Sequence, residues 1–236
     1  MTELNKTAAD PAKEKLNILW LYPDVLDLHG GRGDLMGLMH AAELLGLEPE
    51  IRRVDGFNDE PDFAWADIIW LAPGEVRCAK VVADKLRPRL DELQGALSRG
   101  ALLVANDSSA AAVAKQTFRL DGSVFEGLGL VDMDCREMEQ VVGNDIWFAL
   151  PDGEEIMAIQ ISLLKLELGE GAQPLGRVVY GYGNDGKGNE GAVQGNVVVT
   201  TALGPVCVKT PASPTASSAR PWPAGGLLSK QTSRRS

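Results

Sequence analysis

Histidine is scarce in this chain of 236 residues: only His29 and His40 occur, both near the beginning. Histidine is the usual general base in serine- and cysteine-based hydrolases, so such a base would have to come from the first 40 residues. The three cysteines, Cys78, Cys135 and Cys207, are far apart and share no metal-ligand spacing. This pattern predicts a reducing, cytoplasmic environment, and it argues against a disulfide framework or a metal site.

Long apolar runs are also missing. No segment reaches the roughly 18 apolar residues that a membrane-spanning helix needs, so no membrane span is expected. Residues 1–15 are polar and lack the apolar region of a signal peptide, and we expect a disordered leader there. Basic charge is scarce as well, because residues 1–208 hold 18 basic and 33 acidic side chains, a net charge of −15. Such an acidic body repels phosphate backbones, which argues against nucleic-acid binding.

The remaining composition, 44% hydrophobic and 24% charged, is that of a globular protein with a substantial core. We assign residues 16–208 to one domain. Residues 209–236 are rich in Pro, Ala, Ser, Thr and Gly and hold five basic residues and no acidic one, so a disordered basic tail is expected. The biased amino-acid composition of this tail is typical both of a natural flexible segment and of out-of-frame translation of a GC-rich gene.

Strand and helix patterns alternate in the first half of the chain. Continuous apolar runs at 16–23, 67–71 and 101–106 predict buried strands, and a short strand is expected at 50–55. Helical spacing of apolar residues predicts helices at 34–46, 79–99 and 108–115, with Asp34 as a helix cap and Pro88 bending the second helix. This order indicates an α/β fold with a parallel sheet covered by helices.

Short β-like runs follow residue 118, with glycine-rich turns between them. They are expected to extend or flank the same sheet, and they lie at 127–134, 141–150, 155–164, 177–182 and 192–202.

Two glycine-rich segments, 30–33 (GGRG) and 181–191 (GYGNDGKGNEG), could in principle cradle a phosphate. The first matches neither the dinucleotide-binding pattern nor the P-loop, since no Lys-Ser/Thr pair follows it. We interpret them as a turn into a helix and a surface hairpin, and no cofactor is expected.

The strand–turn–helix at 101–115 (ALLVANDSSAAAVAK) is the most informative site candidate, because a nucleophile often stands at such an elbow. Asp107 occupies the elbow position. Aspartate is a good helix cap and a poor acyl-transfer nucleophile, so the pattern favours a capping role. Ser108 or Ser109 could act as a nucleophile, but each would need a base, either His29 or a lysine.

Four stretches, 22–46, 125–134, 175–191 and 196–205, together resemble one family in order and spacing. It is the cobyric-acid-synthase-like class I glutamine amidotransferases, and within it the GatD-type glutaminase subunits of lipid II isoglutaminyl synthase. The resemblance covers roughly residues 16–208. It implies a mostly parallel central sheet with flanking helices and extra strands in the C-terminal half. It also implies release of ammonia from glutamine, and a Mur-ligase-like partner, MurT, that uses ATP to amidate the D-glutamate of the peptidoglycan stem peptide.

The resemblance places the family's chemical groups on residues of other types. The nucleophilic cysteine falls on Asp107 and the catalytic histidine on Leu203. The remaining positions are the two glycines after the cysteine on Ser108 and Ser109, the oxyanion loop on Ala72, Pro73 and Gly74, the substrate-binding arginine near Gln140, and an Asn-His-containing segment around 160–163.

Aspartate cannot form a thioester, and leucine cannot accept a proton. The resemblance therefore predicts a chain that has lost glutaminase activity and acts as a binding or regulatory subunit of a MurT-like ligase. Three alternatives stay open at this stage. They are an active amidotransferase subunit that delivers ammonia to a MurT-like ligase, a hydrolase built on Ser108, and a gene product without a present function.

Overall fold

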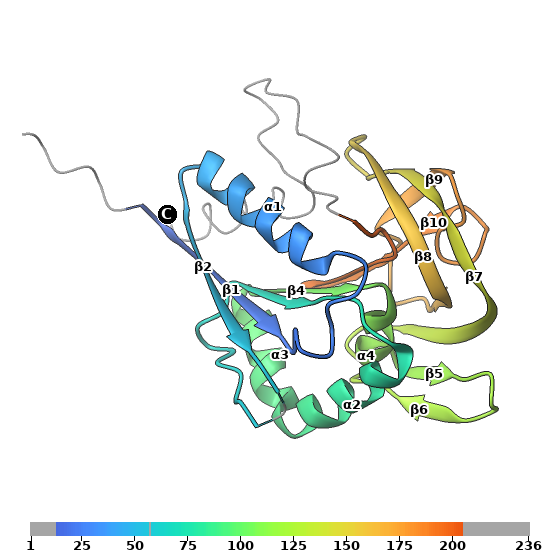
Figure 1. The fold of residues 1–236 in the computed structure, drawn as a ribbon, viewed down its shortest axis with the longest axis horizontal. Helices are drawn as coiled ribbons and strands as arrows, with labels where there is room; N and C mark the ends of the chain where they lie inside the picture. Colours follow the sequence, from blue (N-terminus) through green and yellow to red (C-terminus); the bar gives the residue numbers. More distant parts are fainter. Residues whose placement is uncertain (1–12, 57, 205–236) are drawn as a thin grey trace, which may run out of the picture.

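The computed structural model describes residues 13–56 and 58–204. The predicted tail, and the predicted leader up to residue 12, lie outside these ranges. Within them the chain forms two β-sheets with helices packed against the first (Figure 1). No helix of the described part is long and apolar enough to cross a membrane.

The first sheet has the strand order β11-β12-β4-β3-β1-β2. All neighbouring pairs are parallel except β11 and β12. The strands are β1 (Lys15–Leu21), β2 (Glu48–Val54), β3 (Ile68–Leu71), β4 (Leu102–Asn106), β11 (Ala192–Gln194) and β12 (Val197–Thr200). The predicted parallel neighbours β1, β3 and β4 are confirmed, and their continuous apolar runs are buried because helices cover both faces of the sheet.

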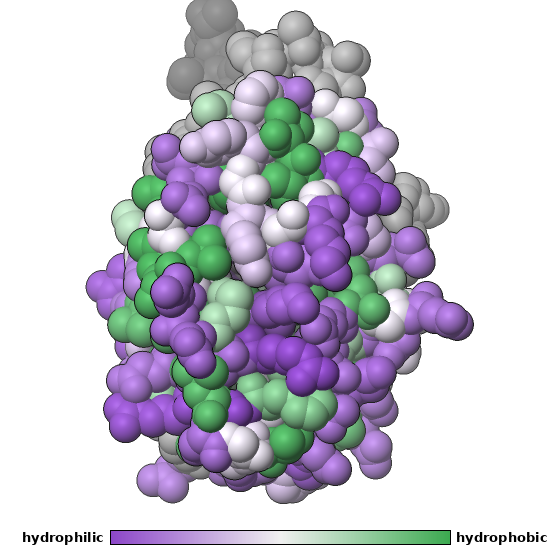
Figure 2. Space-filling view, turned by 90° about the vertical axis from the view of Figure 1, so that its right-hand side faces the viewer, coloured by the Kyte–Doolittle hydropathy of each residue, from purple (hydrophilic) through white to green (hydrophobic). Residues whose placement is uncertain are grey.

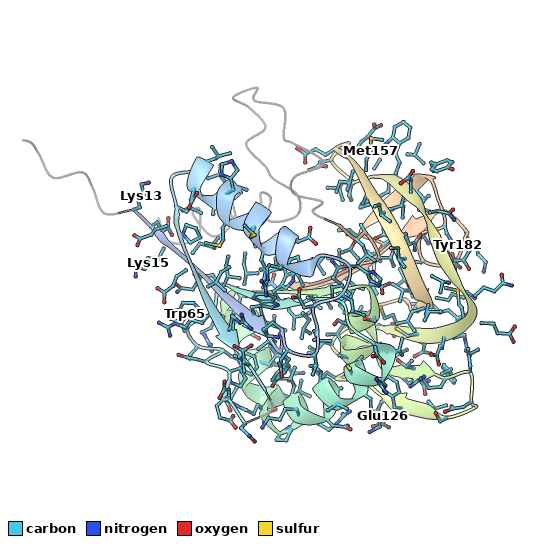
Figure 3. All side chains as sticks on the ribbon, viewed as in Figure 1. Lys13, Lys15, Trp65, Glu126, Met157 and Tyr182 are labelled. Atoms are coloured by element: carbon cyan, nitrogen blue, oxygen red, sulfur yellow. The ribbon has the colours of Figure 1, made fainter. Side chains whose placement is uncertain are left out.

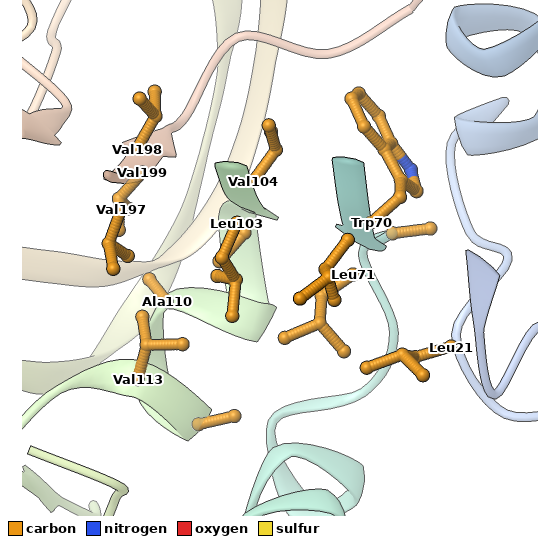
Figure 4. Packing of buried hydrophobic residues seen from close by; sticks show 14 of the residues in the cluster. Leu21, Trp70, Leu71, Leu103, Val104, Ala110, Val113, Val197, Val198 and Val199 are labelled. Atoms are coloured by element: carbon orange, nitrogen blue, oxygen red, sulfur yellow. The ribbon is translucent and has the colours of Figure 1, made fainter. Parts of the chain in front are cut away.

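Helix α1 (Gly31–Leu44) covers one face of this sheet, and α2 (Val76–Leu86), α3 (Leu90–Arg99) and α4 (Ala110–Val113) lie on the other (Figure 1). Side chains alternate across the sheet, as Figure 4 shows. Leu71 and Leu103 point toward α4, whereas Trp70 and Val104 point to the opposite face. The core therefore has one layer on each side of the sheet.

The start of the first helix differs from the sequence prediction. The helix expected from residue 34 begins at Gly31, because Gly30 adopts a left-handed conformation (φ +86°) that turns the chain into the helix. Asp34 is therefore not the cap and lies buried in the first turn. The expected break near Pro88 is confirmed: a 3-10 turn, η1 (Arg87–Arg89), separates α2 from α3.

The second sheet has the order β10-β9-β7-β5-β6, and β8 pairs with β7. Its strands are β5 (Gln116–Phe118), β6 (Val124–Glu126), β7 (Met133–Ala149), β8 (Glu155–Leu168), β9 (Gly176–Tyr180) and β10 (Asn189–Glu190). The strand predicted at 127–134 is wrong for residues 127–132, because the N–H groups of residues 127–131 bond carbonyls of α4 and of the two residues after it, and β7 begins only at Met133. Of the strands that follow α4, β11 and β12 extend the first sheet, and the others form the second sheet.

Candidate functional site

The chain turns sharply between β4 and α4, through the 3-10 turn η2 (Asp107–Ser109). Asp107 takes a left-handed conformation there, with φ +47°. Neither end of this turn has a side-chain capping hydrogen bond, so the predicted capping role of Asp107 is wrong. Non-glycine residues in this conformation carry strain, and they concentrate at functional sites. The geometry is that of an elbow which presents one side chain at the carboxyl end of a parallel strand.

Two serines tie this elbow to the loop after β3. The Ser108 hydroxyl accepts a hydrogen bond from the Gly74 N–H at 2.8 Å and donates one to the Gly74 carbonyl at 2.6 Å. The Ser109 hydroxyl donates to the carbonyl of Ala72 at 2.6 Å. These bonds join the elbow to the predicted oxyanion loop. They also occupy the Gly74 N–H, the group that an oxyanion would need, and Pro73 has no N–H to offer.

A pocket of about 380 Å³ opens beside the elbow. Asp107 and Ser108 line it together with His29, which is also in a left-handed conformation (φ +55°). The structure thus places the elbow and one of the two histidines in the same pocket. The other lining residues are Leu28, Gly74, Glu75, Val76, Arg77, Arg119, Glu137, Val141, Ile161, Ser162 and Leu163.

The Asp107 carboxyl is 6% exposed, and burial raises its pKa from 3.8 to about 6. Hydrogen bonds from the Ser162 hydroxyl and the Ser108 N–H oppose this rise, and the carboxyl of Glu190 adds to it. The oxygen Oδ1 has no hydrogen-bond partner. A carboxyl with a pKa near neutrality can exchange protons, as general acids and bases do, but it offers no thiolate for acyl transfer.

Glu190 belongs to a buried polar network behind Asp107. Its carboxylate accepts hydrogen bonds from the Thr200 hydroxyl at 2.8 Å and from the N–H and hydroxyl of Thr201 at 2.8 and 2.6 Å. Burial raises the pKa of Glu190 despite these bonds. Gln160 donates to Thr201 and exchanges two hydrogen bonds with the backbone of Gly183. Gln160 therefore anchors the 181–191 loop.

The two arginines that line the pocket, Arg77 and Arg119, are not at the position where the resemblance places one. Gln140 is exposed and is not among the lining residues. Instead, Arg119 lines the pocket, and its guanidinium binds the Glu137 carboxylate in a bidentate pair, with Nε 2.6 Å and Nη2 3.3 Å from the two oxygens. No sequence motif marks Arg119, because its partner lies 18 residues away on β7.

Leu203, where the resemblance places the family's histidine, follows β12, while Asp107 follows the neighbouring strand β4. Its backbone pairs with that of Ile159 on β8, and its side chain is buried. Leu203 does not line the pocket, and an aliphatic side chain cannot take a proton. Across residues 13–56 and 58–204, no cluster of three His, Cys, Asp or Glu side chains could hold a metal ion.

The fold that carries this elbow and the loop beside it is similar to solved structures. A crystal structure of a glutamine amidotransferase matches with a TM-score of 0.57 at 17% identity, over 89% of this chain and 97% of that one. PurLQS from Thermotoga maritima matches with a TM-score of 0.52 at 15% identity, over 81% and 87% of the two chains. The chain therefore has the fold of the glutamine amidotransferases, which confirms the predicted fold class.

The sequence comparison narrows the class. The chain is 25% identical over 195 residues to the GatD subunit of the glutamine-hydrolysing lipid II isoglutaminyl synthase of Streptococcus pneumoniae (strain ATCC BAA-255 / R6). The match spans 81% of this chain and 75% of that relative. No protein-family model matches. The chain is thus a glutamine amidotransferase-like protein and a homologue of GatD.

Replacing Ser108 with alanine should destabilise the fold. Ser108→Ala leaves the buried N–H and carbonyl of Gly74 without their partner, at a cost of about 1–3 kcal/mol in the free energy of unfolding. Urea denaturation measures this loss. Ser98→Ala, at an exposed position on α3, is the matched control and should change stability by less than about 0.5 kcal/mol. Equal stability of the two variants would contradict the proposed joint between elbow and loop.

Asp107 should make stability depend on pH. Because the pKa of its carboxyl is raised to about 6 in the folded state, its favourable contribution is complete below about pH 4 and is lost as pH rises through 6. We expect Asp107→Asn to gain stability over the wild type between pH 4 and pH 7.5, by up to about 3 kcal/mol. Chemical denaturation at several pH values tests this, with Asp91→Asn on α3 as an exposed control. A constant difference across the range would contradict it.

Proposed function

We propose that this chain is a GatD-like subunit that does not hydrolyse glutamine and that binds a Mur-ligase-like partner in lipid II amidation. The observation that carries the first part is the elbow itself. Asp107 stands at the nucleophile position, and Ser108 occupies the Gly74 N–H that would stabilise an oxyanion. Glutamine hydrolysis through a thioester needs both a thiolate and that donor.

The alternative of a Ser108-based hydrolase has less support. The Ser108 hydroxyl donates a hydrogen bond to the Gly74 carbonyl and accepts one from the Gly74 N–H. A base in the pocket would have to break both bonds to activate this serine. His29 lines the same pocket, which keeps this reading testable. An amidotransferase subunit that receives ammonia from another protein is compatible with the same elbow.

The partner-binding part is supported by an apolar row on the second sheet. Met157, Trp147 and Tyr180 are register neighbours on β8, β7 and β9, so their side chains share one face. Met157 and Tyr180 are 61% and 64% exposed. Figure 3 shows Met157 at the outer end of β8, and Figure 2 shows hydrophobic patches among polar residues on this side of the molecule. Exposed apolar groups of this kind mark protein–protein contacts.

The 181–191 loop is a weaker candidate for the interface than its sequence suggests. A Cβ at Gly183 would lie 2.3 Å from the Asn189 carbonyl, and one at Gly191 would lie 2.3 Å from the Val199 carbonyl. These glycines are therefore explained by close backbone packing. The apolar row defined by Trp147, Met157 and Tyr180 is the surface to test.

Purified protein should release no ammonia from glutamine above background, alone or with a Mur-ligase-like protein. Asp107→Cys/Leu203→His should restore little activity, because the Gly74 N–H stays bonded to Ser108. Adding Ser108→Gly frees that donor and should raise the rate of the double variant about 100-fold, the usual effect of one oxyanion donor. A coupled glutamate dehydrogenase assay measures ammonia. Wild-type turnover that Ser108→Ala abolishes would replace this proposal with the serine hydrolase.

A Mur-ligase-like protein from the same genome should bind the wild type in a pull-down. Tyr180→Glu should weaken this binding at least about tenfold, because it places a charge in a desolvated contact. Val124→Glu is the matched control: Val124 is 50% exposed on β6, at the far edge of the same sheet. Unchanged binding by Tyr180→Glu would exclude this surface, and no binding by the wild type would overturn the proposed partnership.

A further inference from the structure

Asp107 is the charged group in the pocket without a counter-ion. The lining holds three carboxyls and two guanidiniums. Arg77 pairs with Glu75 at 2.7 Å, and Arg119 pairs with Glu137 at 2.6 Å. Among the ion pairs of the described residues, none includes Asp107. The lining therefore carries one uncompensated negative charge when this carboxyl is ionised.

One oxygen of the Asp107 carboxyl also lacks a hydrogen-bond donor. Its oxygen Oδ1 is buried without a hydrogen-bond partner, which is uncommon for a polar atom in a folded protein. A ligand that brings N–H donors and a positive charge would satisfy both needs at once. A carboxylate ligand would add a second negative charge beside the first, and a neutral amide would leave the charge uncompensated.

The walls of the pocket define the rest of the ligand. Five lining side chains are aliphatic, and the volume is about 380 Å³, which suits a small molecule. An ammonium ion alone would leave these walls without contacts, whereas a short hydrocarbon chain would cover them. The aliphatic residues are Leu28, Val76, Val141, Ile161 and Leu163.

We propose that this pocket binds a small primary ammonium compound with a short aliphatic body, and that its ammonium group pairs with the Asp107 carboxylate. The inference rests on the proposed function, since it takes the elbow as a binding site and not as a nucleophile. The charged residue that cannot form a thioester becomes the recognition group for a cation.

The titratable groups around Asp107 do not supply a free positive charge that would take the place of such a cation. Glu190 on β10 and Cys135 on β7 interact with the Asp107 charge, and both are buried. Neither becomes positive on protonation. His29, from the loop before α1, also lines the pocket. Both arginines of the lining, Arg77 and Arg119, are held in ion pairs.

Isothermal titration of the full chain with n-butylammonium, n-butyramide and butyrate tests the proposal. We expect saturable binding of n-butylammonium at pH 7.5, at least about tenfold tighter than the neutral and anionic analogues. Asp107→Asn should weaken it about thirtyfold, because the ion pair is lost. Asp91→Asn, at an exposed position on α3 outside the pocket lining, is the control and should bind as the wild type does.

The affinity for n-butylammonium should also rise about tenfold between pH 5 and pH 7, as Asp107 ionises through a pKa of about 6. Asp91→Asn should keep this rise and Asp107→Asn should lose it, which assigns the pH dependence to Asp107. Equal affinity for n-butyramide, unchanged binding by Asp107→Asn, or no binding by the wild type would overturn the inference.

The ammonia assay on the same protein separates the two proposals. No n-butylammonium binding together with no glutamine hydrolysis would overturn the ligand alone. Glutamine hydrolysis by the wild type would overturn the proposed function, whatever the amine does. Asp107→Asn is expected to fold well, because it removes a buried charge at neutral pH.

Discussion

The site depends on the hydrogen bonds between the η2 turn and the loop after β3. Ser108 holds both backbone groups of Gly74, and Ser109 holds the carbonyl of Ala72. These bonds connect the ends of two adjacent parallel strands, so they keep the elbow in its strained conformation against the sheet. A glycine at either serine position would leave these backbone groups to find another partner. The same bonds that stabilise the elbow thus remove the donor that acyl transfer would use.

The second constraint is the burial of two carboxyls at this edge of the sheet. Glu190 is satisfied by two threonines on β12 and its continuation, whereas Asp107 keeps one oxygen without a partner. Because both are shielded from water, the carboxyl of Glu190 disfavours the ionised form of Asp107. Polar groups of this kind are retained in folded proteins when the fold or a ligand supplies what they lack. Asp107 lines the pocket, so a ligand that enters from the solvent can supply the hydrogen-bond partner that its carboxyl lacks.

Much of the first sheet follows from local sequence. The runs at 16–23, 67–71 and 101–106 are too uniformly apolar for a one-sided sheet, so they indicate strands covered on both faces. The break at Pro88 also follows from one residue, because its ring removes a helical hydrogen bond. The separation of the later strands into a second sheet does not follow, since period-two patterns carry no information on which strands pair.

The sequence by itself determined the residue types, which are a carboxyl side chain at the elbow position 107 and an aliphatic side chain at position 203. Only the tertiary structure decided what the remaining residues do. It brought His29 and Arg119 into one pocket with Asp107, made Ser108 a partner of Gly74, and left Gln140 exposed. The physical reason is that chain distance says little about spatial distance once parallel strands align their carboxyl ends. Charge, burial and hydrogen bonding at the site therefore arise from groups on separate segments of the chain.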